Sequence, residues 1–242
     1  MVHNQVFVPT VAEFPRDIET SWELQKPLAD IGYRPGLMLV VRGADAGKPR
    51  VFDKENVKKQ YDNLAKHAEK YGNADIVTML PNMPVGDIDF LHNGEFAKDH
   101  VLAGIEFARG LPIGGRRLLT FHTNNFVSAE EFVSQDIKYW IDQMQDEFTP
   151  RLKQIRDAGK TSGVKVLVET YPMPVFGDYA PGDGAVYRGV HLRDLREVSY
   201  IMSRNTGEDI VLREAELGIC LDVCHARTVY QAVYNKMGGL MF

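Results

Sequence analysis

The sequence predicts an α/β protein built on a parallel β-sheet. Six short segments are rich in aliphatic residues, and most of them are separated by segments with helical periodicity. Their apolar residues form continuous runs, which is typical of strands buried on both faces of a parallel sheet. The predicted strands span residues 5–8, 37–41, 76–80, 118–121, 164–168 and 219–221. Strand–helix alternation implies right-handed crossovers and leaves two architectures, an open doubly wound sheet and a closed barrel.

Helical periodicity connects several of these strands. Apolar residues recur at spacings of three and four within residues 57–71, 132–148 and 192–202, as expected for helices that pack on a core. Ser128 and Glu131 form a capping-box pattern before the second stripe. Pro150 is expected to end or kink that helix, because proline removes a backbone donor and its ring clashes with the preceding turn.

Composition narrows the class of protein. The chain has 242 residues with 28 Lys+Arg and 33 Asp+Glu, so its formal net charge is −5, and 44% of its residues are hydrophobic. This excludes a disordered or collagen-like chain and favours a single domain over residues 1–242. No apolar run approaches the ~20 residues of a membrane span, and the N-terminus lacks a secretory signal pattern. With only Cys220 and Cys224, a disulfide-built fold is disfavoured and we expect a cytoplasmic protein.

Nucleotide-binding loops are not found in the sequence. It contains neither G-x-G-x-x-G nor G-x-x-x-x-G-K-[ST], which an open nucleotide-binding sheet usually carries after its first strand. The Gly114–Gly115 pair comes before a predicted strand and therefore indicates a turn. The acidic balance disfavours nucleic acid as a partner.

Polar, chemically versatile residues follow three consecutive predicted strands. His122 follows the fourth strand, Glu169 the fifth, and Asp222 the sixth, with His225 three residues later. The carboxyl ends of parallel strands lie on one rim, where functional groups collect in both architectures. Two imidazoles and two carboxylates suit Zn, Mn, Co or Mg. We therefore expect a divalent-metal site, beside which a carboxylate could act as a general base.

Three motifs resemble those of the xylose-isomerase-like barrel superfamily. They are L-G-I-C-L-D-V-C-H-A around Asp222 and His225, V-L-V-E-T-Y-P around Glu169, and L-T-F-H ending in His122. Their order and spacing agree with the superfamily over roughly residues 90–227. The superfamily contains sugar and sugar-phosphate isomerases and epimerases, and abasic-site nucleases of the endonuclease IV type. The resemblance implies a (β/α)8 TIM barrel with a divalent metal at the carboxyl-end mouth.

The two branches imply different roles for the same residues. In the isomerase branch, Glu169 and Asp222 would bind the metal, Glu169 would also exchange a proton with the substrate, and His225 would contact substrate oxygens. We place His122 with His225 as a substrate-binding residue. In the nuclease branch, His122, Glu169, Asp222 and His225 would all be zinc ligands.

Only six of the eight strands of that barrel are visible in the sequence. The seventh- and eighth-strand ligands of the isomerases, a His and a Glu, have no counterpart, because 17 residues follow His225 and none is a histidine. We therefore expect a C-terminally truncated barrel whose isolated chain binds metal weakly.

The sequence favours a metal-dependent isomerase or epimerase that acts on a small carbohydrate, and a homo-oligomer is compatible with it. Two alternatives remain: a zinc phosphodiesterase for abasic DNA, and a non-catalytic degenerate barrel. The nuclease is disfavoured because Met79-Leu-Pro-Asn82 stands where that branch would place a third-strand histidine.

Overall fold

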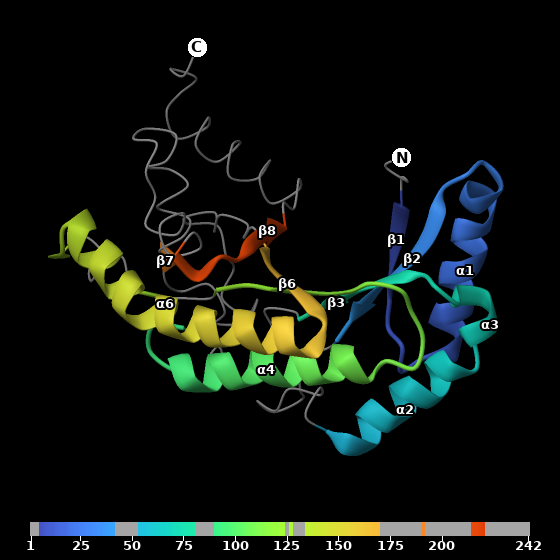
Figure 1. Ribbon diagram of the computed structural model, residues 1–242, viewed down its shortest axis with the longest axis horizontal. Helices are drawn as coiled ribbons and strands as arrows, with labels where there is room; N and C mark the ends of the chain where they lie inside the picture. The colour runs from blue at the N-terminus through green and yellow to red at the C-terminus, as the bar shows by residue number, and fades with distance from the viewer. Residues whose placement is uncertain are drawn as a thin grey trace, which may run out of the picture. The chain divides into compact units, whose positions relative to one another are not determined.

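The computed structural model of the protein describes residues 5–41, 53–80, 90–123, 126–127, 134–169, 190–191 and 214–220. A six-stranded sheet alternates with helices along the chain (Figure 1). All six predicted strands are present in it, as β1 (Gln5–Thr10), β2 (Arg34–Val40), β3 (Asp75–Met79), β4 (Arg117–Phe121), β6 (Val164–Glu169) and β8 (Gly218–Cys220). Their order in the sheet is β1-β2-β3-β4-β6-β8, which is also their order along the chain.

The strand registers are parallel, as the continuous apolar runs predict. Thr10 pairs with Leu39, Leu39 with Thr78, and Thr78 with Leu119, so one row crosses β1 to β4. All four side chains in this row are almost fully buried. The face of the sheet to which this row points is therefore covered at this level, as expected where helices pack on a parallel sheet.

A cavity of about 620 Å3 is lined by residues of several strands of the sheet. Gln5 of β1, Asp75 of β3, Leu118 of β4 and Lys165 of β6 all line it. Neighbouring strands lie ~4.8 Å apart, so in a flat sheet β1 and β6, four steps apart, would be separated by roughly 19 Å. A single cavity lined by residues of both strands agrees with a sheet that bends around it, as in a barrel.

The described helices are α1 (Pro15–Asp30), α2 (Lys54–Ala65), α3 (Ala68–Tyr71), α4 (Gly94–Gly110) and α6 (Ile137–Ser162). The predicted helical stripe over residues 57–71 forms two helices, α2 and α3, with a break at Lys66 and His67. The capping-box residues Ser128 and Glu131 and the stripe at residues 192–202 lie outside the described residues. Within the described ranges, no helix is both long and apolar enough to cross a membrane.

Of the two effects expected of Pro150, ending its helix is wrong, and kinking it stays a prediction. Helix α6 continues through Pro150 to Ser162. Phe148, Leu152 and Ile155, on both sides of the proline, are completely buried. An interior proline costs ~3 kcal/mol, whereas each fully buried large apolar side chain contributes roughly 1.5–3 kcal/mol. Burial on both sides of Pro150 therefore outweighs the lost hydrogen bond.

The chain divides into two compact units. The first comprises Met1–Met83, Asp99–Phe121 and Asp157–Leu167, and the second comprises Pro84–Lys98, His122–Arg156 and Val168–Phe242. The sheet row from Thr10 to Leu119 belongs to the core of the first unit. In the second unit the rings of Phe90 and Phe148 pack with their centroids 5.9 Å apart. The expectation of one domain over residues 1–242 stays a prediction.

The Gly114–Gly115 turn lets two chain segments of the first unit approach closely. Gly114 has a φ of +120°, which favours glycine, and the Gly115 N–H donates to the Ala74 carbonyl at 2.8 Å. A Cβ at position 115 would lie 2.6 Å from the Asn73 carbonyl oxygen. The turn places Arg116 beside the buried carboxylate of Asp75, which accepts from the Arg116 backbone N–H and from its guanidinium.

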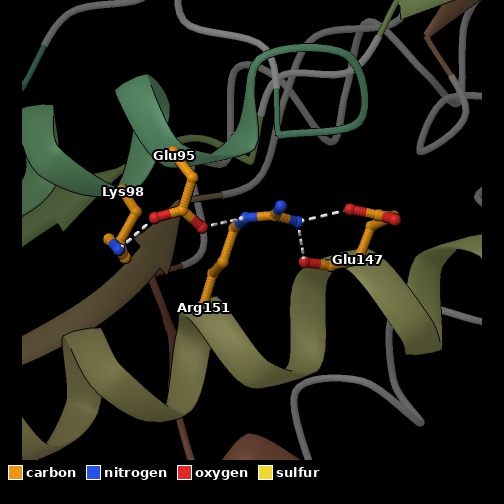
Figure 2. A network of polar contacts seen from close by, with 4 residues as sticks. All are labelled: Glu95, Lys98, Glu147 and Arg151. Carbon is orange, nitrogen blue, oxygen red and sulfur yellow. Dashed lines mark hydrogen bonds and ion pairs between the residues drawn. The ribbon is translucent and has the colours of Figure 1, made fainter.

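A second close approach, in the second unit, joins the start of α4 to α6 (Figure 2). The Arg151 Nε donates to Glu95 at 3.0 Å and its Nη1 donates to Glu147 at 2.6 Å, while Lys98 also pairs with Glu95. These hydrogen bonds, from Lys98 first and then from Arg151, hold the pKa of Glu95 below its ordinary value. A Cβ at Gly94 would lie 2.5 Å from the Arg151 guanidinium carbon.

We expect Gly115→Ala and Gly94→Ala to lower the free energy of unfolding by different amounts. Gly115→Ala places its methyl group against a backbone carbonyl that cannot rotate away, so we expect a loss of about 1–3 kcal/mol in the free energy of unfolding. In Gly94→Ala the new methyl group contacts the end of the flexible Arg151 side chain, which can move, so the loss in the free energy of unfolding should be smaller. Urea denaturation of both variants checks this. A Gly115→Ala protein as stable as the wild type would contradict the close approach.

Candidate functional site

The structure brings His122 and Glu169 together. His122 directly follows β4 and Glu169 is the last residue of β6. The His122 Nε2 lies 3.7 Å from the Glu169 Oε2, and both side chains are at least nine-tenths buried. Both residues belong to the second compact unit. The rule that neighbouring parallel strands end on one rim therefore holds for this pair.

Sheet order explains the proximity. β4 and β6 are neighbours in the sheet although α6 and the short strand β5 (Phe126–Val127) separate them along the chain. Neighbouring strands lie ~4.8 Å apart, so side chains at equivalent ends are within reach of one another. Positions 122 and 169 therefore meet through the crossover between β4 and β6.

The distance of 3.7 Å is too long for a hydrogen bond, and the contact is an ion pair when the imidazole is protonated. It also suits two atoms that share a metal ion. Zn–N and Zn–O distances of ~2.0–2.2 Å in tetrahedral geometry separate two donor atoms by roughly 3.4 Å. An imidazole nitrogen and a carboxylate oxygen are both donors that divalent ions accept. The His122–Glu169 pair thus fits two positions of a metal site.

The other two predicted site residues, Asp222 and His225, lie outside the described residues. Strand β8 ends at Cys220, two residues before Asp222 in the sequence, and is the sheet neighbour of β6. Among the residues that the structure describes, no group of three or more His, Cys, Asp or Glu side chains could hold a metal ion. The roles of Glu169, Asp222, His122 and His225 therefore stay predictions.

A short antiparallel ladder joins the segments that follow the two strands. Strand β5 pairs with β7 (Val190–His191), with Phe126 opposite His191 and Val127 opposite Val190. β5 begins four residues after His122, and β7 begins 21 residues after Glu169. Sequence analysis missed this ladder, because two-residue strands carry too little periodicity to be detected.

The comparisons with solved structures define the fold. A D-tagatose 3-epimerase-like protein aligns with 95% of this chain and 71% of its own, at 17% identity and a TM-score of 0.50. The TTHB071 protein of Thermus thermophilus, soaked with zinc chloride, aligns over 93% of this chain and 68% of its own, at 15% identity and a TM-score of 0.52. A candidate sugar phosphate isomerase/epimerase from Anabaena variabilis aligns over 100% and 73%, at 12% identity and a TM-score of 0.56. No family model and no curated protein matches the sequence.

The chain therefore has the fold of a (β/α) barrel, with part of each neighbour lacking a counterpart in it. The neighbours agree with the resemblance to the xylose-isomerase-like superfamily, and the predicted fold class is confirmed. Two of the three neighbours bear the names of sugar epimerases or isomerases.

A double-mutant cycle tests whether the buried pair interacts. For His122→Ala and Glu169→Ala we expect a coupling free energy of about 0.5–3 kcal/mol near pH 6, where an ordinary imidazole is largely protonated. His67 and Glu19 form a control with the same 3.7 Å separation, but Glu19 is 61% exposed. Water and salt weaken such a pair, so its coupling should be below about 1 kcal/mol.

The cycles are measured by urea denaturation at low and high salt. The His122–Glu169 coupling should be the larger and the less sensitive to salt, because its side chains are buried. A coupling no larger than that of the control pair would show that the two side chains are neighbours without interacting.

Proposed function

We propose that the protein is a divalent-metal-dependent isomerase or epimerase of a sugar or sugar-like substrate. The observation that carries this proposal is the buried Glu169 carboxylate at the carboxyl end of β6, 3.7 Å from the His122 imidazole. A carboxylate in a barrel mouth is suited to remove a proton from a carbon next to a carbonyl group. The names of two structural neighbours point to the same class of reaction.

Each residue has a defined task in this proposal. Glu169 accepts the proton from the carbon next to the carbonyl and returns it to the carbonyl carbon, while the proton of the adjacent hydroxyl group moves to the former carbonyl oxygen, which completes an isomerisation. Return of a proton to the opposite face of the carbon that lost it completes an epimerisation and requires a second proton donor. His122 and His225 bind substrate oxygens, while Glu169 and Asp222 hold the metal. When bound, the metal would polarise the carbonyl or hydroxyl oxygen and so stabilise the charge that develops there.

The site proposed for the metal predicts which substitutions abolish binding. Glu169→Gln combined with Asp222→Asn removes both anionic ligands and should reduce bound Mn, Co or Zn to near zero, because amides are weak ligands for these ions. Glu23→Gln changes an exposed carboxylate on α1 and should leave the metal content unchanged. Equilibrium dialysis followed by elemental analysis measures all three proteins. Equal metal content in the wild type and the double variant would contradict this site.

Proton transfer by Glu169 predicts hydrogen exchange. In deuterated water with manganese, the wild type should exchange the hydrogen next to the carbonyl of a ketose substrate, observed by proton NMR. Glu169→Gln should lower the exchange rate by about 10²–10⁴-fold, since general base catalysis contributes that much. Glu23→Gln again serves as the control. Exchange that is unchanged in Glu169→Gln would exclude this base.

One observation also favours the nuclease reading. His122 and Glu169 lie within a distance that one zinc ion could bridge, and both would be ligands in that branch. Cleavage of a duplex with an abasic site, without exchange on any ketose, would identify this activity. If neither reaction occurs while the metal binds, a non-catalytic barrel is supported. A cytoplasmic location and a homo-oligomeric state stay predictions.

A further inference from the structure

A cationic cavity lies at the amino ends of the strands, the opposite end of β4 from His122. This is the cavity of about 620 Å3 described above, which residues of β1, β3, β4 and β6 line. Its ionisable lining residues are Arg116, Arg117, Lys165 and Asp75, so its formal charge is 3 − 1 = +2. The whole chain has a formal charge of −5, so the lining of this cavity is positive although the protein as a whole is negative.

Arg116 is fixed in place at the rim of the cavity. Its Nε and Nη2 donate to the Asp75 Oδ2 at 2.9 and 2.6 Å, and its backbone N–H donates to Oδ1 at 2.9 Å. The Asp75 side chain is 3% exposed and that of Arg116 is 78% exposed. Burial alone would raise the pKa of Asp75, but the bonds and charge of Arg116 outweigh it and hold that pKa low. The Nη1 group forms no hydrogen bond with any described residue and is accessible to a ligand.

The charges of the other two cations are not neutralised by a carboxylate in the described residues. The Arg117 guanidinium donates to the backbone carbonyls of Arg109 and Leu111 at the end of α4, which orients it without cancelling its charge. The side chain of Lys165, an exposed residue on β6, forms no ion pair or hydrogen bond within the described ranges. Phe7 and Leu118 add apolar surface, and Gln5 and Ser162 add neutral polar groups.

We propose that this cavity binds a small organic oxyanion that carries several negative charges on phosphate or carboxylate groups. A volume of about 620 Å3 lies within the usual range for small-molecule sites. Guanidinium groups recognise the planar or trigonal oxygens of these anions through paired N–H donors, and the lysine adds a mobile charge. The apolar wall favours an anion attached to a carbon skeleton. The proposal does not depend on the metal site or on the proposed reaction.

Calorimetric titration with pyrophosphate and with citrate, at constant ionic strength, tests this site. The two probes distinguish a ligand charged by phosphate groups from one charged by carboxylate groups. We expect one binding event per chain for at least one probe, weakened by added sodium chloride. Lys165→Gln should weaken that binding about tenfold. Lys153→Gln, which changes an exposed lysine on α6 outside the cavity, should leave it unchanged. Glu169→Gln should also leave it unchanged, which separates this site from any metal that could chelate the probes.

Two results would overturn the proposal. One is the lack of binding of both probes to the wild type at millimolar concentration. The other is equal affinity in Lys165→Gln and Lys153→Gln. In either case the basic side chains would serve only to stabilise the negative ends of the helices, to which Arg117 already donates. Urea denaturation of Lys165→Gln, expected to match the wild type, confirms that any loss of binding is not a loss of folding.

Discussion

Parallel strand pairing is the constraint on which the rest of the structure depends. β1 to β4 pair in parallel register, and each is joined to the next by a crossover connection of one hand. The carboxyl ends of these strands therefore lie at the same edge of the sheet. Which functional side chains lie together is therefore decided by the strand end at which they stand, and not by how close they are in the sequence. His122 and Glu169 meet at carboxyl ends, whereas Arg116, Arg117 and Lys165 collect near amino ends.

The two sets of residues differ in how the fold holds them. His122 and Glu169 are buried at 3.7 Å from each other, an arrangement that requires both strands to be in place. Arg116 is held instead by contacts near it in the fold. The Gly114–Gly115 turn approaches Asn73 and Ala74 so closely that no side chain fits, and the Arg116 guanidinium donates to the Asp75 carboxylate. A buried carboxylate without that partner would carry the full cost of its desolvation.

Much of the fold is predictable from the sequence because buried parallel strands leave a strong local signal. Residues 37–41 are apolar throughout and residues 164–168 are apolar except for Lys165, and the structure places a strand at each. The expected helix end at Pro150 was wrong because propensity is a local quantity, whereas the burial of Phe148 and Leu152 is not. The β5–β7 ladder was missed because its pairs, Phe126↔His191 and Val127↔Val190, join residues that are remote in the sequence within strands of only two residues.

The sequence by itself determined the six strands of the main sheet, the helical stripes at residues 57–71 and 132–148, and which residue types stand at the strand ends, since these depend on residues near one another in the chain. Only the tertiary structure decided that His122 lies beside Glu169 and that Lys165 lines one cavity with the adjacent residues Arg116 and Arg117. Each of these depends on sheet order, and a linear pattern of apolar and polar residues does not encode the distance between strands that are remote in sequence.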